Sequence, residues 1–266
     1  MSHRFWFPVS PLPAVDLPLL IDAARCASRI ATSFAGPTAT RWDKADGAGP
    51  VTEADLAVDT YLRETLLLAR PDYGWLSEET EDGAARLDRD MVFIVDPIDG
   101  TRNFVEGGQT WAISMAIARK GQVTAGVIAL PLRNKLFAAG IGCGATLNGA
   151  PINVREMEIP PRVLCARPII DDHHWPGGRP HFSRHYRPSL AYRLALVGQG
   201  RFEGMVTLRR SWEWDIAAGA LIISEAGGVV SDRHGAPLRF NSPDGHLPGV
   251  VAAEPALHAR LIAGLS

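Results

Sequence analysis

The chain has 266 residues, and its apolar content of 46% and charged content of 21% are typical of a globular enzyme with a sizeable core. Its formal net charge of −2 excludes a general electrostatic attraction to nucleic acid or to an anionic membrane surface. A negatively charged substrate would therefore have to be met locally, by metal ions or by a few placed cations.

The three cysteines are odd in number and far apart, which argues against a disulfide framework or a zinc site. We expect Cys26, Cys143 and Cys165 to be small core residues. No apolar run approaches the roughly 20 residues needed to cross a bilayer, and residues 1–13 lack the apolar core of a signal peptide. These features predict a cytoplasmic protein with no membrane partner.

The first elements are two predicted helices separated by a loop. Apolar residues recur at helical spacing over residues 16–34, with Asp16 as the expected N-cap. The polar, glycine-containing segment 41–50 is predicted to be a mobile loop. A second helix is expected over residues 52–69, and Thr52 followed by Asp55 has the spacing of a capping box.

A run of predicted strands follows the helices and completes the first half of the chain. The strands are expected at 73–77, 92–95, 112–118, 123–130 and 135–139, the last three separated by turn residues. Pro97 cannot continue a hydrogen-bond ladder, so the strand at 92–95 is expected to stop there. This order predicts an α+β half with the helices on one face of the sheet.

The pattern changes near residue 151, and we predict two halves, 1–150 and 151–266. The second half has predicted strands at 163–166, 204–208, 229–231 and 250–252, and helices at 189–197, 215–226 and 255–265. The segment 171–187 is predicted to be irregular. Its histidines, at positions 173, 174, 181 and 185, lack the regular spacing of a metal site.

The most informative stretch lies where the strand at 92–95 ends. Asp96 and Asp99 are three residues apart, Gly100 allows the backbone to approach a ligand closely, and Thr101 supplies a hydroxyl and an N–H group. Asp, Pro and Gly are also ordinary turn residues, so an acidic turn without a ligand is the alternative.

Further carboxylates stand where other predicted elements begin or end, at Asp55, Glu78 and Asp215. Carboxylates brought within a few ångström raise one another's pKa, and a divalent cation relieves that repulsion. An oxygen-only donor set favours Mg²⁺ over zinc or copper.

Four segments, in order, carry a specific resemblance. Lys44 precedes Pro-Val-Thr-Glu-Ala-Asp at 50–55, Ser-Glu-Glu occupies 77–79, Asp-Pro-Ile-Asp-Gly-Thr occupies 96–101, and Trp-Asp-Ile-Ala-Ala-Gly at 214–219 precedes Glu-Ala-Gly-Gly at 225–228. With these segments the chain resembles the inositol monophosphatase superfamily of Mg²⁺-dependent, lithium-sensitive phosphatases. The resemblance implies an α+β fold, a layered α-β-α-β-α sandwich of the inositol monophosphatase and fructose-1,6-bisphosphatase type, with the active site between the halves.

The resemblance also implies the metal ligands. Glu78, Asp96 and the carbonyl of Ile98 would hold one Mg²⁺, and Asp96, Asp99 and Asp215 would hold a second. Glu78 would also help with a weaker third. Two cations of this kind lower the pKa of water and neutralise the attacking and leaving oxygens together.

The catalytic roles implied by the resemblance fall on neighbouring residues. Asp55 and Thr101 would orient and deprotonate the attacking water, with Glu78 also at the catalytic centre. The backbone N–H groups of Gly100 and Thr101 would receive the phosphate. Lys44 is assigned to electrostatic interaction with the phosphate or the metal-binding loop.

Departures from the family pattern bear on the substrate. Arg102 replaces a small hydroxyl residue, and Leu208 stands where an acid holds inositol hydroxyls. Arg209 and Arg210 would meet an extra phosphate and Trp212 would stack on a base, the alternatives being a solvated turn and a packed aromatic side chain.

The predicted function is therefore hydrolysis of a small phosphate monoester. The sequence after residue 210 is similar to bacterial 3′(2′),5′-bisphosphate nucleotidases, which makes 3′-phosphoadenosine 5′-phosphate the leading substrate. Inositol 1-phosphate and histidinol phosphate are the alternatives. A regulator that binds RNA or the transcription machinery is the non-enzymatic alternative, although the net charge argues against nucleic acid as main partner. A homodimer is expected, since similar proteins commonly form one.

Overall fold

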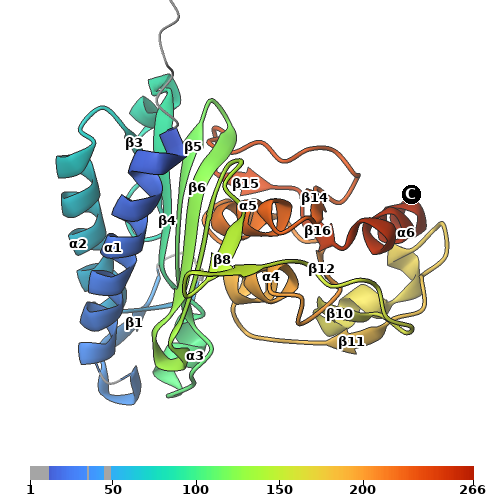
Figure 1. The fold of residues 1–266 in the computed structure, drawn as a ribbon. Coiled ribbons are helices and arrows are strands. Elements are labelled where there is room, and N and C mark those ends of the chain that lie inside the picture. Colours follow the sequence, from blue (N-terminus) through green and yellow to red (C-terminus); the bar gives the residue numbers. More distant parts are fainter. Residues whose placement is uncertain (1–11, 35, 45–48) are drawn as a thin grey trace, which may run out of the picture.

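Helix and sheet alternate in layers through the chain (Figure 1). The computed structural model describes residues 12–34, 36–44 and 49–266. The two N-terminal helices, α1 (Leu12–Ser33) and α2 (Glu53–Ala69), cover one face of a seven-stranded sheet, and α4 (Leu190–Gly198) with α5 (Ala217–Glu225) covers the other. A second, five-stranded sheet follows, with α6 (Pro255–Leu265) on its far side. This arrangement confirms the predicted α-β-α-β-α sandwich.

The seven-stranded sheet is mostly antiparallel, with β3 and β4 its parallel pair. Its members in spatial order are β3 (Gly74–Ser77), β4 (Met91–Asp99), β5 (Ala112–Arg119), β6 (Gln122–Leu130), β7 (Lys135–Gly140), β8 (Ala145–Leu147) and β9 (Ala150–Ile152). All nine residues of β4 are buried, because helices cover both faces of the sheet.

The second sheet mixes parallel and antiparallel pairs. Its order is β11 (Ser183–His185), β10 (Arg162–Cys165), β12 (Gly204–Thr207), β16 (Val250–Ala253) and β14 (Val229–Ser231). Two ribbons complete the strands, β1 (Arg41–Asp43) with β2 (Pro50–Thr52) and β13 (Ser211–Trp212) with β15 (His246–Leu247). The short helices are α3 (Thr101–Val105) and 3₁₀ turns at Gly36–Thr38, Ala84–Asp88, Pro131–Arg133, Arg167–Ile170 and Asp172–His174.

Helix α5 lies directly on the seven-stranded sheet. A Cβ atom added to Gly126 of β6 would lie 3.0 Å from the Cα of Ala218, so any other residue would force the helix and the strand slightly apart. The contact brings the N-terminal end of α5 close to the end of β4.

Most predicted elements are confirmed, but the predicted start of the first helix and the predicted end of the strand at 92–95 were wrong. Helix α1 begins at Leu12, and Asp16 lies inside it, where its carboxylate accepts hydrogen bonds from Arg70 Nε (2.9 Å) and the Tyr73 hydroxyl (3.0 Å). Strand β4 runs through Pro97 to Asp99, because its register with β5 shifts between Asp96 and Asp99 and the irregularity accommodates proline.

Other expectations were wrong because short strands carry little sequence signal. Strands β1 and β2 form a hairpin where a loop was expected over 41–50, although residues 45–48 lie outside the described residues. Strands β8, β9 and β11 were not foreseen. Only Cys165 is buried, whereas Cys26 is half-buried and Cys143 exposed. The division at residue 150 stays a prediction.

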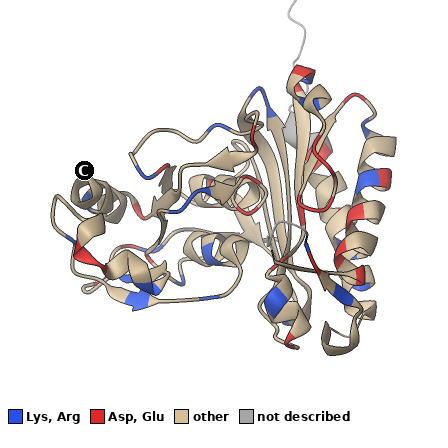
Figure 2. Cartoon of the chain, turned by 180° about the vertical axis from the view of Figure 1, so that it is seen from behind, with Lys and Arg blue, Asp and Glu red and all other residues tan. Residues whose placement is uncertain are grey.

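Two absences hold for the part of the chain that the structure describes. The histidines of 171–187 join no metal-ligating group there. None of the helices in that part has the length and apolar character that crossing a membrane requires. Acidic and basic residues are interspersed along the helices (Figure 2), as expected for a net charge near zero.

Candidate active site

Three carboxylates converge where β4 ends and α5 approaches. Asp96, Asp99 and Asp215 each place one oxygen within 4.8 Å of the others. Burial, together with the negative charges of neighbouring acids, raises the pKa of Asp96 and of Asp215 well above the ordinary range. The three carboxylates can all be ionised together only when a cation lies among them.

The hydrogen bonds of Asp96 indicate which carboxylate oxygen lacks a positively charged partner. Its Oδ1 accepts a hydrogen bond from the Ile98 N–H (3.0 Å), whereas its buried Oδ2 has no hydrogen-bond partner among the described residues. A buried polar atom without a partner is costly, and native proteins satisfy nearly all of them. An oxygen-only donor set around such an atom fits a hard divalent cation.

Strand β5 positions Asp215 opposite Asp96. Ser114 pairs with Asp96 across the β4–β5 ladder, and its hydroxyl donates to the carbonyl of Trp214 (2.9 Å). The preceding Glu213 is buried and accepts from the N–H groups of Asn241 (2.5 Å) and Ser242 (2.8 Å). No sequence pattern indicates this role of Ser114, because its hydrogen bond joins distant parts of the chain.

Helix α4 positions Asp99. The carboxylate accepts hydrogen bonds from the Ser189 hydroxyl (2.6 Å) and the Ala191 N–H (2.6 Å), while Ser189 also caps α4 by accepting from the Tyr192 N–H (2.9 Å). Burial raises the pKa of Asp99 to about 6, against these hydrogen bonds and the positive charge of Arg193. A serine before a helix is recognisable in sequence as an N-cap, but the bond from the Ser189 hydroxyl to Asp99 is not.

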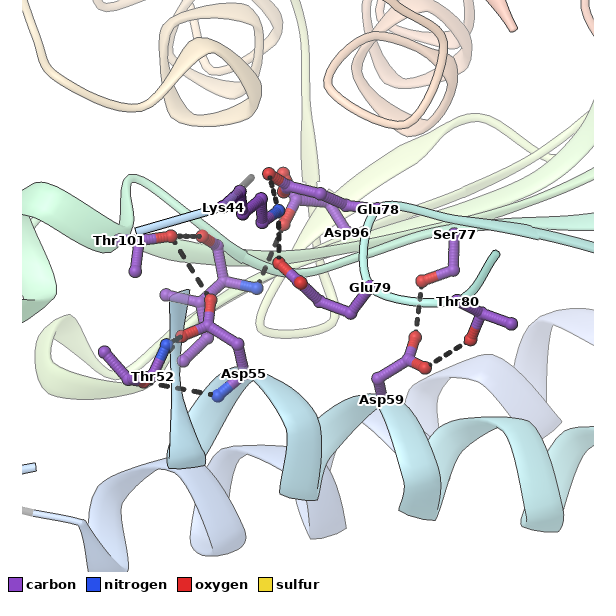
Figure 3. A network of polar contacts seen from close by, with 11 residues as sticks. Lys44, Thr52, Asp55, Asp59, Ser77, Glu78, Glu79, Thr80, Asp96 and Thr101 are labelled. Atoms are coloured by element: carbon purple, nitrogen blue, oxygen red, sulfur yellow. Dashed lines mark hydrogen bonds and ion pairs between the residues drawn. The ribbon is translucent and has the colours of Figure 1, made fainter. Parts of the chain in front are cut away.

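Asp55 lies in the first turn of α2, behind Thr101 (Figure 3). Its Oδ2 accepts from the N–H (2.9 Å) and hydroxyl (2.5 Å) of Thr52, which confirms the capping box. The Thr101 hydroxyl lies 3.2 Å from Asp55 Oδ1 and 3.1 Å from the carbonyl of Ile98. Burial raises the pKa of Asp55 to about 6, although the Thr52 hydrogen bonds oppose it. The left-handed Gly100 (φ 100°) turns the chain from β4 into α3.

Lys44 bridges two acids and lies between Thr101 and Glu78 in the network (Figure 3). Its Nζ lies 2.8 Å from Glu78 Oε1 and 2.7 Å from Glu79 Oε1. Burial raises the pKa of Glu79 to about 7, even though Lys44 opposes the shift. The sequence pattern did not indicate a role for Glu79 or for Asp59, which accepts hydrogen bonds from Ser77 and Thr80.

A cavity of about 500 Å³ gathers most of the predicted site residues. Its lining includes Lys44, Glu78, Asp96, Ile98, Asp99, Gly100, Thr101, Arg209, Trp212 and Asp215. Arg210 is not among them, and its guanidinium pairs with Asp244 (2.5 Å). The Trp212 ring stacks on Trp214 (centroids 4.3 Å apart) and contacts His246 (3.4 Å), which reduces the face it offers to a base.

Comparison with known proteins decides the family. The family model described as "Inositol monophosphatase family" matches residues 16–266. The chain belongs to this family. It is therefore a phosphoric monoester hydrolase.

Relatives of the family bear two kinds of name. The chain is 35% identical to an inositol-1-monophosphatase of Rhizobium meliloti (strain 1021), over 72% of this chain and 76% of the relative. It is 30% identical to Nus factor SuhB of Escherichia coli (strain K12), over 81% of this chain and 84% of the relative. A crystal structure of extragenic suppressor protein suhB from Bartonella henselae superposes with a TM-score of 0.79 at 28% identity, over 94% and 98% of the two chains. The likeness to bisphosphate nucleotidases stays a prediction.

Proposed function

We propose that the chain is an Mg²⁺-dependent hydrolase of a small phosphate monoester. The unpartnered, buried Oδ2 of Asp96 within the cluster of three carboxylates carries this proposal. Glu78, Asp96 and the Ile98 carbonyl would hold one cation, and Asp96, Asp99 and Asp215 a second. Bound there, the cations would activate a water molecule and neutralise charge on the phosphate.

Thr101 and Asp55 are proposed to move the proton of the attacking water. The Thr101 hydroxyl has one proton and two acceptors in reach, Asp55 and the Ile98 carbonyl. Its oxygen can accept a hydrogen bond from water while its proton points to Asp55, which is ionised at neutral pH because its pKa is about 6. The N–H groups of Gly100 and Thr101 are proposed to receive the phosphate, with Lys44 adding positive charge beside Glu78.

The substrate proposal remains 3′-phosphoadenosine 5′-phosphate, with inositol 1-phosphate and histidinol phosphate as alternatives. Arg209 in the cavity wall supports an anionic substrate, whereas the covered ring of Trp212 gives less support to base stacking. The name of the Rhizobium relative supports inositol 1-phosphate. The Nus factor name of the Escherichia coli relative supports the regulator as a second candidate function.

The test is phosphate release from the three substrates in the presence of Mg²⁺. Wild type should release phosphate from at least one, Asp96→Asn should release none, and Thr101→Val should lose about 10²–10⁴-fold in rate. The surface variant Asp90→Asn, which removes the same charge from an exposed pair with Lys120, should behave as wild type.

The outcome of the phosphate-release assay distinguishes the hydrolase from the regulator. If wild type released no phosphate from any substrate, the hydrolase proposal would be wrong for these esters. Binding of transcription-machinery components that persists in Asp96→Asn would then favour the regulator. Lithium inhibition, a homodimer and a cytoplasmic location stay predictions.

A further inference from the structure

A second cavity opens beside the first and shares part of its wall. It has a volume of about 780 Å³, and the residues common to both cavities are Glu78, Gly100, Thr101 and Arg209. A substrate whose phosphate lies over the carboxylate cluster can therefore extend its alcohol part into this second cavity.

Guanidinium groups dominate the charge of this second cavity. Its lining includes Arg102, Arg193, Arg209 and Arg233, which come from four separate segments of the chain. Within residues 12–34, 36–44 and 49–266, none of these four has a carboxylate within ion-pair distance. Glu78 is the one acid in the described lining, and Lys44 already binds it.

Arg193 is the most constrained of the four. Its side chain is buried, its Nε lies 3.3 Å from the Ser189 carbonyl, and its guanidinium lies over the Tyr186 ring at 5.2 Å. Carbonyl oxygens and an aromatic face hold the group in place, and Asp99 attracts it without forming an ion pair at contact distance. A buried cation without a carboxylate partner is costly unless a ligand supplies the negative charge.

Apart from Glu78, which Lys44 binds, the described wall offers no carboxylate to the hydroxyl groups of a polyol. Leu208 lines the cavity where the family pattern has an acid, and its carbonyl already accepts from Arg233 (3.3 Å). Hydroxyl groups donate well to carboxylates, whereas guanidinium groups donate and cannot accept. The recognition chemistry of this wall is therefore directed at oxygen anions.

We propose that the second cavity binds a second phosphate group, carried by the alcohol part of the substrate. This inference rests on the proposed hydrolase function and narrows its substrates to bisphosphates. It assigns specificity to Arg193, Arg209 and Arg233, and it removes Arg210, which lines neither cavity and pairs with Asp244. Guanidinium groups suit this task because they bind phosphate oxygens in pairs.

The test uses two ligands that differ only in the second phosphate, 3′-phosphoadenosine 5′-phosphate and adenosine 3′-phosphate. Calorimetric binding is measured with Mg²⁺ in the Thr101→Val background, where turnover is slow. The bisphosphate should bind at least tenfold more tightly. Adding Arg209→Gln or Arg233→Gln should reduce that ratio to about threefold or less. Arg210→Gln, the matched control from the neighbouring position, should leave it unchanged.

Two results would overturn the inference. One is equal affinity for the two ligands in the Thr101→Val background, and the other is an equal effect of Arg209→Gln and Arg210→Gln on the ratio. Phosphate release by wild type from the same two compounds is measured separately. Absence of release from both would contradict the hydrolase proposal for these esters, while the binding ratio still decides whether the second cavity holds a phosphate.

Discussion

The Asp96 carboxylate is buried and is repelled by the neighbouring carboxylates. It has one unpartnered oxygen, and Asp99 and Asp215 crowd it from two sides. Because burial and like charge raise its pKa, ionising Asp96 in the metal-free protein costs folding free energy. That cost is small at low pH, where the group is protonated, and grows as the pH rises through its folded-state pKa.

We therefore expect Asp96→Asn to stabilise the metal-free protein while abolishing turnover. In a chelator at neutral pH, the variant should melt at a higher temperature than wild type, by about 2–4 °C for each kcal/mol of relieved repulsion. Added Mg²⁺ should raise the Tm of wild type much more than that of Asp96→Asn. Asp90→Asn should match wild type in both conditions, and a metal-free Asp96→Asn that melted lower would argue against the repulsion.

At the residue scale the sequence predicted the acids but not their supports. Asp96, Asp99 and Asp215 stand at the ends of predicted elements, so their convergence could be foreseen with the help of the family pattern. The hydroxyls of Ser114 and Ser189 could not, because serine is common in strands and caps and its partner lies far along the chain.

Among the elements, β5 controls the relation between β4 and α5. The backbone of Ser114 pairs with Asp96, and its hydroxyl donates to the carbonyl that precedes Asp215, so one residue of β5 links the two ligands. The short strands β8, β9 and β11 were missed because three residues show no clear alternation.

We expect Ser114→Ala to weaken Mg²⁺ binding as well as the fold. Removing the hydroxyl leaves the Trp214 carbonyl without its donor, at a cost of about 1–3 kcal/mol in unfolding free energy. Titrating Mg²⁺ by its effect on Tm should show a higher apparent Kd.

The matched control is Thr124→Val in the same sheet. Its hydroxyl donates to the carbonyl of Ile117 (3.2 Å), a bond of the same kind without a metal ligand at either end. Thr124→Val should lose comparable stability and keep its Mg²⁺ affinity. If both variants weakened Mg²⁺ binding equally, Ser114 would have no positioning role.

At the scale of the whole molecule, an ion pair between a partly exposed arginine and a buried glutamate supports the second sheet. The fully buried carboxylate of Glu203 accepts from the backbone N–H (2.6 Å) and the guanidinium (2.7 Å) of Arg162 on β10. Burial acts to raise the pKa of Glu203, but the hydrogen bonds from Arg162 outweigh it and hold the pKa below the ordinary value of 4.5. The stability it contributes is thus present above pH 4.5 and lost as the pH falls through the folded-state pKa.

Glu203→Gln should therefore lower the free energy of unfolding by about 3 kcal/mol at pH 7. Urea unfolding at decreasing pH should show the gap from wild type closing below about pH 4.5, since wild-type Glu203 then becomes protonated too. Glu158→Gln, in the exposed pair with Arg155, should cost less than about 1 kcal/mol. A gap that stayed constant down to pH 3 would contradict the assigned pKa direction.

The architecture was predictable because the family pattern spans both halves of the chain. The position of α5 on the sheet was not, because it depends on the contact between Gly126 and Ala218, which no local sequence pattern indicates. Gly126 permits that approach, and the approach delivers Asp215 to β4.

Because Asp215 comes late in the chain, the complete carboxylate cluster can form only late in synthesis. Residues of β4 leave the ribosome well before the segment that carries Asp215, so a nascent chain first holds two of the three clustered carboxylates, Asp96 and Asp99, without the third. A cation bound by both segments would tie together a long stretch of chain and slow its opening. Catalytic competence and resistance to unfolding are therefore acquired together, late in translation, and a truncated product gains neither.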